Sequence, residues 1–385
     1  MAAEFAPAQT FNVLHNFNGL DGRQPYAGVT VDGGGNLYGT AYDGGTGAGT
    51  VYKLTHHGSG WTLDVLSSFA GGGANPYAGV IFGPNGTLYG TTSKSSADGG
   101  NGTVFNLSPL PSVCKTSLCD WSEDVLYGFT GAPHDGYGPG PGDVSFDQAG
   151  NIYGVTYSGG NGYGVVYQLT PAGGSWTENV LHLFAYGDGA YPYSRMILDN
   201  AGNVYGTTWG GSATADGTVF ELTPSGSGWT STVLYSFQSA SDGGNPYAGV
   251  IFDSSGNLYG ATSSGGTGGG GTVFKLTPSN GSWTYSVIYS FAGTNDCGPQ
   301  NSLVMDAAGN LYGTTYCDGA DSLGNVFKLT ASGDGWSYTS LHDFSGGNDG
   351  EIPFCSVAFD SSGNIYGTTV TGGTQEVGTI WEITP

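Results

Sequence analysis

An internal repeat of a little over fifty residues dominates this sequence. The tetrapeptide Asn-(Leu/Ile/Val)-Tyr-Gly occurs seven times in 385 residues, once with Thr87 in place of Asn. Successive copies are 51, 64, 52, 54, 53 and 54 residues apart. A fixed period of this length indicates an architecture in which each copy forms one unit that packs on its neighbours. We therefore expect a single domain over residues 1–385. The seven tyrosines are Tyr38, Tyr89, Tyr153, Tyr205, Tyr259, Tyr312 and Tyr366.

Each copy contains four strand-like segments separated by turn residues. In the fifth copy, an apolar run at 247–253 precedes a Ser-Ser-Gly-Asn turn and a second segment at 257–262. A third segment at 271–277 and an alternating fourth at 283–291 complete the copy. No segment has a helical period. Seven units of four antiparallel strands predict an all-β fold, a seven-bladed β-propeller.

The two ends of the chain are expected to close the ring. The last copy ends at Pro385 without a fourth strand, and residues 11–17 supply a suitable one. Pairing of this N-terminal strand with the last blade hides the edges that an open array would expose. The one long interval marks an insertion in a single blade, at 106–121, and not a domain boundary.

Composition limits the class of partner. There are 30 Asp plus Glu against 7 Lys plus Arg, a net charge of −23. Nucleic-acid binding needs clustered cations, so nucleic acid is not an expected partner. No apolar run is long enough for a transmembrane helix, so we expect no membrane insertion. Self-repulsion should keep the protein soluble and monomeric.

The cysteines bear on the compartment. Cys114 and Cys119 suit a small disulfide-closed loop, because no second Cys or His pair stands nearby to complete a zinc site. At most two of Cys297, Cys317 and Cys355 can pair, which leaves one thiol. A disulfide in an acidic protein predicts secretion or a cell-surface location. The first five residues carry no signal-peptide features, which suits a chain that begins after a removed signal.

The repeat resembles the GloVer tandem repeat. The resemblance rests on the run Gly-Asn-Leu-Tyr-Gly-Thr-Thr, a Gly-Gly loop and Gly-Thr-Val-Phe-Lys-Leu-Thr, and it covers essentially the whole chain. It implies an exported, often surface-anchored bacterial protein and brings no known activity with it. The Asp-x-x-Gly-Asn-(Leu/Ile)-Tyr hairpin is more loosely similar to NHL-type and virginiamycin B lyase-like propellers.

The predicted blades define two faces. The loop that leads into each innermost strand and the loop between the second and third strands should emerge together, on what we call the mouth face. The Asp-x-x-Gly-Asn turns should emerge on the opposite, hairpin face. Their repeated aspartates would also suit calcium, but turn capping explains them better, and we predict no cofactor or metal site. These aspartates are Asp32, Asp147, Asp199, Asp253, Asp306 and Asp360.

Departures from the repeat on the mouth face indicate candidate ligand contacts. The consensus of the leading loop is Pro-Tyr-Ala-Gly-Val, and Asp143 and Arg195 replace its glycine on adjacent blades. They predict either an ion pair between blades or contacts to a ligand. Further aromatic and amide residues occupy matching positions of the two loops. The predicted ligand-binding residues are Tyr26, Tyr42, Tyr77, Asp143, Tyr157, Tyr193, Arg195, Trp209, Tyr247, Gln300, Asn301 and Tyr316.

Aromatic rings beside amide, hydroxyl and carboxylate groups are typical of sugar-binding surfaces. The sequence therefore predicts an extracytoplasmic binding module that holds a neutral glycan or another polar polymer at the channel mouth. One alternative is a polysaccharide lyase or glycoside hydrolase on the same face, with Asp135 or Asp318 beside Asp143. Another is a structural or adhesive surface protein without a small ligand. The catalytic candidates are His134, Asp143, Tyr193 and Arg195.

Overall fold

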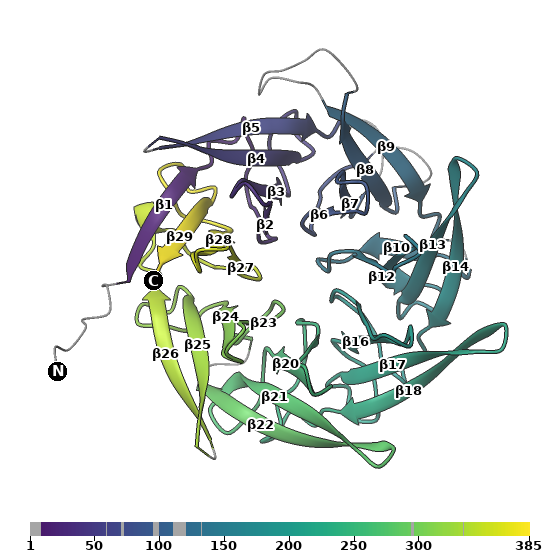
Figure 1. Ribbon diagram of the computed structural model, residues 1–385. Helices are drawn as coiled ribbons and strands as arrows, with labels where there is room; N and C mark the ends of the chain where they lie inside the picture. The colour runs from purple at the N-terminus through teal and green to yellow at the C-terminus, as the bar shows by residue number, and fades with distance from the viewer. Residues whose placement is uncertain are drawn as a thin grey trace.

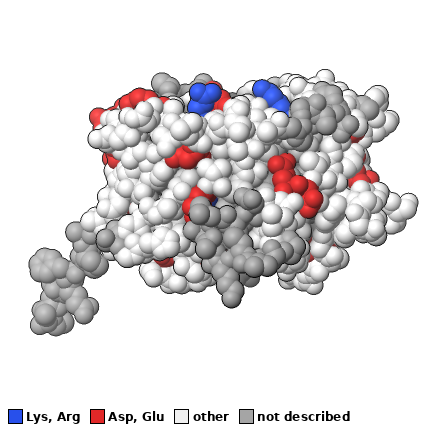
Figure 2. All heavy atoms as spheres, turned by 90° about the horizontal axis from the view of Figure 1, so that it is seen from above, with Lys and Arg blue, Asp and Glu red and all other residues white. Residues whose placement is uncertain are grey.

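The computed structural model describes residues 9–58, 60–70, 73–94, 100–110, 121–131, 133–293, 296–333 and 335–385. Over these ranges the chain forms seven antiparallel sheets, arranged as blades around a central axis (Figure 1). The predicted seven-bladed propeller is confirmed. Seen edge-on, the molecule is a thick disc on which Asp and Glu show at more places than Lys and Arg (Figure 2).

Within each blade the strands follow one another from the axis outward. Blade 1 comprises β2 (Thr30–Val31), β3 (Leu37–Ala41), β4 (Thr50–His57) and β5 (Gly60–Ser68). Blade 2 comprises β6 (Ile81–Phe82), β7 (Leu88–Thr92), β8 (Thr103–Pro109) and β9 (Trp121–Gly128). Blade 3 comprises β11 (Ser145–Phe146), β12 (Ile152–Gly159), β13 (Val165–Ala172) and β14 (Ser175–Leu183). Blade 3 also carries β10 (Gly136–Pro139), which pairs with β12.

The remaining blades repeat this order. Blade 4 comprises β15 (Ile197–Leu198), β16 (Val204–Thr208), β17 (Thr218–Ser225) and β18 (Gly228–Ser236). Blade 5 comprises β19 (Ile251–Phe252), β20 (Leu258–Thr262), β21 (Gly269–Ser279) and β22 (Ser282–Ala292). Blade 6 comprises β23 (Val304–Met305), β24 (Leu311–Thr315), β25 (Asn325–Ser332) and β26 (Gly335–Asp343). Blade 7 contains β27 (Ala358–Phe359), β28 (Ile365–Thr369) and β29 (Thr379–Thr384), preceded by the 3₁₀ turn η1 (Gly347–Asp349).

The N-terminal strand closes the ring, as predicted. β1 (Thr10–Asn16) pairs antiparallel with β29, from Thr10 opposite Thr384 to Asn16 opposite Thr379. It forms the outermost strand of blade 7, so the purple and yellow ends of the chain lie side by side (Figure 1). The Phe11 ring also stacks on His342 of blade 6, with 3.6 Å between ring centroids. The closing strand therefore joins two blades.

The innermost strands are shorter than the apolar runs suggested. In blade 5 the run 247–253 contributes only Ile251 and Phe252 to the sheet. The residues before them bond to neighbouring blades: the Thr207 hydroxyl donates to the Ala248 carbonyl at 2.8 Å, and the Gly249 amide donates to Ser302 Oγ at 3.1 Å. These bonds replace the sheet ladder and leave the segment lining the axis.

The core lies between the blades. Each hydrophobic cluster of the described residues joins two neighbouring blades, and one such cluster fills each seam. The glycine of the Tyr-Gly motif serves this packing. A Cβ on Gly39 would lie 2.4 Å from the Tyr52 hydroxyl, because the Tyr52 ring rests on the bare glycine backbone. The repeated Tyr-Gly is thus a packing motif, as we interpreted it.

The hairpin aspartates cap turns. Asp253 Oδ1 accepts hydrogen bonds from the amides of Ser255 and Asn257, and Oδ2 accepts from Asn257 Nδ2 and from the Tyr259 hydroxyl at 3.1 Å. Partial burial opposes these bonds, but they prevail and lower the pKa of Asp253. In the part of the chain that the structure describes, no group of three or more His, Cys, Asp or Glu is placed to hold a metal ion.

The predicted insertion falls between two strands of blade 2. β8 ends at Pro109 and β9 begins at Trp121, so the predicted segment 106–121 overlaps the ends of both strands. Cys114 and Cys119, with the disulfide predicted between them, lie outside the described residues.

Candidate functional site

Three layers of side chains surround the axis below the mouth face. They come from alternate residues of the segment that leads into each innermost strand. All of them except Tyr26, Tyr77, Phe354, Gly249 and Ser145 line a central channel of about 500 Å³. The first layer holds Tyr26, Tyr77, Pro141, Tyr193, Tyr247, Gln300 and Phe354. The second holds Gly28, Gly79, Asp143, Arg195, Gly249, Ser302 and Ser356. The third holds Thr30, Ile81, Ser145, Ile197, Ile251, Val304 and Ala358.

Aromatic side chains of the first layer pack on one another across the mouth. Tyr26 stacks on Tyr77 with 4.6 Å between centroids, and Tyr193 stacks on Tyr247 at 5.2 Å. The Phe354 ring joins the two pairs, since it lies 6.2 Å from Tyr77 and 6.4 Å from Tyr247. We call these five residues the aromatic layer.

A second cavity, of about 310 Å³, lies on the mouth face beside the aromatic layer. We call it the tyrosine groove. The Tyr157 and Tyr193 rings are nearly parallel, 6.0 Å apart, and continue the stack of Tyr193 on Tyr247. The groove is thus lined by a row of aromatic rings that carry hydroxyl groups. Its lining residues are Tyr42, Tyr77, Ser93, Lys94, Tyr137, Pro139, Gly140, Pro141, Tyr157, Tyr193 and Tyr247.

The extra strand β10 forms one wall of this groove. Tyr137 pairs with Ser158 of β12 and is 41% exposed. Gly138 has φ of +65°, and a Cβ there would lie 2.3 Å from the Tyr157 ring. Glycine therefore lets the strand lie against Tyr157. Sequence reasoning missed Tyr137, although its glycine-rich segment departs from the repeat.

Two phenols near the middle of the groove, Tyr157 and Tyr193, have raised pKa values. Burial, with the neighbouring tyrosines adding to it, raises the pKa of Tyr193 to about 12 and also raises the pKa of Tyr157. Each hydroxyl can therefore donate and accept hydrogen bonds. Lys94, which sequence reasoning also missed, is the groove's one cation among the described residues.

Second-layer side chains reach back to the preceding blade. Asp143 Oδ1 accepts from the Gly79 amide at 2.8 Å, as Ser302 Oγ accepts from Gly249, and Arg195 Nε donates to Ser145 Oγ at 3.1 Å. Among the described ion pairs none joins Asp143 to Arg195 within 4.0 Å. The expected ion pair is thus replaced by separate bonds between blades. Burial raises the pKa of Asp143, although Arg195 and the Gly79 amide oppose it.

The predicted ligand residues divide into three groups. Five line the tyrosine groove: Tyr42, Tyr77, Tyr157, Tyr193 and Tyr247. Asp143, Arg195, Gln300 and Asn301 line the channel, as do Tyr193 and Tyr247. The others contact rings of the aromatic layer: Tyr26 stacks on Tyr77, Trp209 lies 6.0 Å from Tyr247, and Tyr316 lies 6.2 Å from Phe354.

The candidate bases do not join Asp143. His134 is exposed and lines neither cavity. The Asp135 carboxylate is buried and accepts hydrogen bonds at 2.6 Å from the amides of Thr130 and Gly136, so it holds its own loop. Asp318 lines neither cavity.

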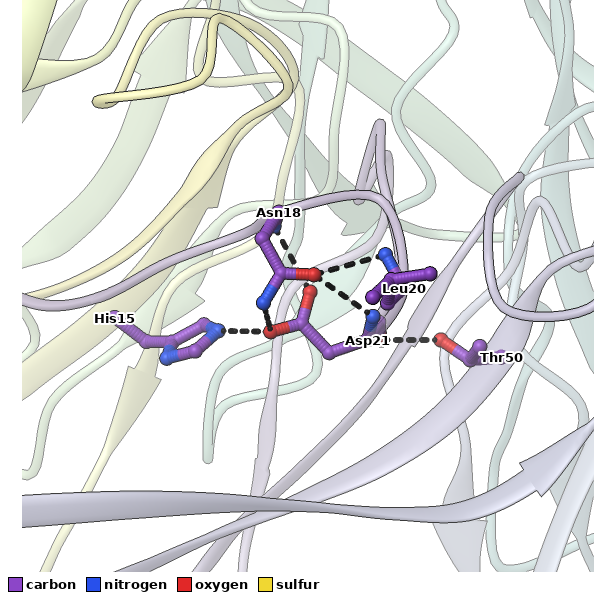
Figure 3. Close-up of polar contacts among 5 residues, drawn as sticks. All are labelled: His15, Asn18, Leu20, Asp21 and Thr50. Carbon is purple, nitrogen blue, oxygen red and sulfur yellow. Dashed lines mark hydrogen bonds and ion pairs between the residues drawn. The ribbon is translucent and has the colours of Figure 1, made fainter.

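A further set of aspartates holds the loops that lead onto the mouth face. In blade 1, Asp21 accepts from the Asn18 amide at 2.9 Å and lies 3.0 Å from His15 Nε2 (Figure 3). Its carbonyl accepts from the Thr50 hydroxyl at 2.9 Å (Figure 3). Blades 4 and 7 repeat the His–Asp contact, through His182 with Asp188 and His342 with Asp349. The signal in the sequence is an Asp-Gly pair shortly before the leading Pro.

A disulfide joins Cys297 to Cys317, and Cys355 is a buried free thiol. Two of the three late cysteines pair, as expected. Cys297 and Cys317 occupy facing positions of the leading and second loops, 4.6 Å apart at Cα. Arg23 and Asp43 occupy the same facing positions in blade 1, where they form an ion pair. The disulfide therefore replaces a charge contact between two mouth-face loops.

The fold and the site define a propeller of tandem repeats with an aromatic mouth face. The chain belongs to the Gloeobacter/Verrucomicrobia repeat family, which matches residues 3–123, 114–251 and 227–385. This repeat family and the disulfide suggest an extracellular protein. Across the described residues, no helix is long and apolar enough to span a membrane.

Solved structures resemble this chain at low sequence identity. A gluconolactonase from Xanthomonas campestris is 14% identical, with 78% of this chain and 82% of that chain covered and a TM-score of 0.41. A structure described as an oxidoreductase (glucose dehydrogenase) from Thermus thermophilus is 16% identical, with 82% and 98% covered and a TM-score of 0.45. At these identities the likeness concerns the fold alone. No curated protein matches the sequence.

Proposed function

We propose that this protein is an extracytoplasmic binding module that holds a neutral glycan, or a similar polar polymer, in the tyrosine groove. The observation that carries the proposal is the row of rings formed by Tyr157, Tyr193 and Tyr247, open along one side as a cavity of about 310 Å³. Sugar rings present flat C–H faces that stack on aromatic rings, while phenol, hydroxyl and ammonium groups bond to sugar hydroxyls. The groove supplies both kinds of contact.

The shape of the groove favours a polymer segment over an ion or a small charged metabolite. Its lining comes from blades 1 to 5 and contains six tyrosines but one cation and no carboxylate among the described residues. Binding would thus depend on stacking and neutral hydrogen bonds, and it should be insensitive to salt.

A structural or adhesive role is the second candidate. It is favoured by the aromatic layer, in which rings from five blades pack on one another across the mouth. Such packing stabilises the inner ends of the blades whether or not a ligand binds. A lyase or hydrolase has weaker support, because His134 and Asp135 do not face Asp143.

Affinity electrophoresis against neutral and acidic polysaccharides tests the proposal, with the lanes also assayed for released sugar ends. We expect retardation by at least one neutral polysaccharide, no released ends, and the same retardation at low and high salt. Released sugar ends would contradict a binding module and indicate a lyase or hydrolase. No retardation across the panel would favour the structural role.

A further inference from the structure

The central channel beneath the aromatic layer shares Pro141, Tyr193 and Tyr247 with the tyrosine groove, but the rest of its lining has a different chemistry. Its volume of about 500 Å³ is in the range of small-molecule sites. Asp143 and Arg195 are the only charged residues that line it within the described chain. Five of the seven second-layer positions carry Gly or Ser, and a Cβ added at Gly28 or Gly249 would meet the backbone carbonyl of Ser356 or Arg195, so these glycines let neighbouring segments lie close together.

The Arg195 side chain is exposed, and its guanidinium makes one hydrogen bond to the described part of the protein. Nε donates to Ser145 Oγ at 3.1 Å, which fixes the side chain against blade 3. The two terminal nitrogens have no hydrogen-bond or ion-pair partner among the described residues, although the side chain lines the channel. A guanidinium offers parallel N–H donors that match a planar carboxylate. This geometry points to an anionic group of the ligand.

Five of the seven residues of the third layer are apolar. Ile81, Ile197, Ile251, Val304 and Ala358 each follow a second-layer residue by two positions and line the channel. All five are only half-buried, so they present apolar surface to the cavity. An aliphatic chain that extends from Arg195 along the axis would cover this surface, and that burial is favourable.

We propose that the channel binds a small monocarboxylic acid with an apolar chain, its carboxylate on Arg195 and its chain against the third layer. A single negative charge suits the one guanidinium, since the nearby Asp143 would repel a dianion. The site is distinct from the tyrosine groove and does not depend on the glycan proposal.

Isothermal titration of the whole protein with sodium octanoate tests this site, with octan-1-ol and octylammonium as chain-matched probes. We expect octanoate to bind at least tenfold more tightly than either. Hexanoate should bind about fifteenfold more weakly than octanoate, since each buried methylene contributes about fourfold. Equal binding of the three eight-carbon probes would overturn the proposal.

Variants locate the site. Arg195→Gln should weaken octanoate binding at least tenfold, whereas Arg23→Gln, which removes a surface arginine paired with Asp43, should leave it unchanged. Asp143→Asn keeps an acceptor for the Gly79 amide and removes the opposing charge, so binding should tighten. Unchanged binding by a folded Arg195→Gln variant would refute the assignment. If that variant does not fold, Arg195→Lys is measured instead. We expect it to bind octanoate more weakly than the wild type and still to prefer octanoate over octan-1-ol. Wild-type affinity for octanoate would refute the bidentate contact.

Discussion

The seam between blades 2 and 3 contains a carboxyl group whose titration should be visible in the stability of the protein. Glu178 of β14 accepts a hydrogen bond from the Tyr127 hydroxyl of β9 at 2.9 Å. Burial, together with the nearby Asp135 carboxylate, raises the pKa of Glu178 from its ordinary 4.5 to about 7, and the Tyr127 bond opposes this rise. The folded state therefore holds a proton that the unfolded chain releases.

The sign and size of the effect follow from linkage. Protonated Glu178 stabilises the folded state. This contribution to the unfolding free energy is fully present below pH 4.5 and is lost as pH rises from 4.5 to about 7. Each pH unit corresponds to about 1.4 kcal/mol, and screening of this partly exposed side chain lowers the total to roughly 1–2 kcal/mol. Neutral glutamine in its place cannot lose a proton. From pH 5 to pH 8, the unfolding free energy of the wild type should therefore fall by roughly 1–2 kcal/mol more than that of Glu178→Gln.

Urea denaturation followed by tryptophan fluorescence at pH 5 and pH 8 measures this difference. Glu221→Gln is the matched control, because it also removes a carboxylate that bonds to a tyrosine hydroxyl, that of Tyr205. The control should follow the wild type. If Glu178→Gln and the wild type change equally between the two pH values, the reasoning about this seam is refuted.

Three further predictions concern closure and cysteine chemistry. Deletion of residues 1–18 removes β1 and the Phe11–His342 stack, so we expect a lower melting temperature or oligomers in size-exclusion chromatography; an unchanged monomer would contradict the closure. Joint replacement of Cys297 and Cys317 by Ser should cost about 3 kcal/mol, because their bond closes a loop with a sequence separation of 20, and an unaltered melting curve would argue against it. Burial raises the pKa of Cys355 to about 11, so peptide mapping should find it unlabelled by iodoacetamide at pH 8 until denaturant is added; rapid labelling of the folded protein would show that the thiol is accessible.

The fold was predictable because seven copies of the repeat carry similar turn and packing residues. Turn-capping aspartates such as Asp253 and the bare backbone of Gly39 act within one blade, so their roles can be inferred from one copy. The closing strand was predictable because a missing fourth strand had one available replacement. The length of the innermost strands was not predictable, since Ala248 and Gly249 bond to neighbouring blades and not to their own sheet.

The sequence predicted on which face of the molecule the site residues lie, but not how these residues contact one another. Position within the repeat placed Tyr157 and Tyr193 on the mouth face, where both line the groove. It could not show that Trp209 contacts Tyr247, or that Asp143 bonds to Gly79, because these contacts depend on how neighbouring blades approach. Tyr137 was missed because its position in the repeat is held elsewhere by residues such as Arg23 and Ala74, which form single bridges to Asp43 and Lys94 and carry no aromatic ring.

The central claim is that the tyrosine groove, and no other part of the mouth face, holds the glycan. The most direct measurement compares retention of Tyr157→Ala with that of Tyr186→Ala on the polysaccharide that retards the wild type. Tyr186 is 43% exposed and lines neither cavity, so its loss controls for removal of a surface ring. We predict that Tyr157→Ala weakens retention about tenfold and that Tyr186→Ala leaves it unchanged. Equal retention of both folded variants would contradict the account.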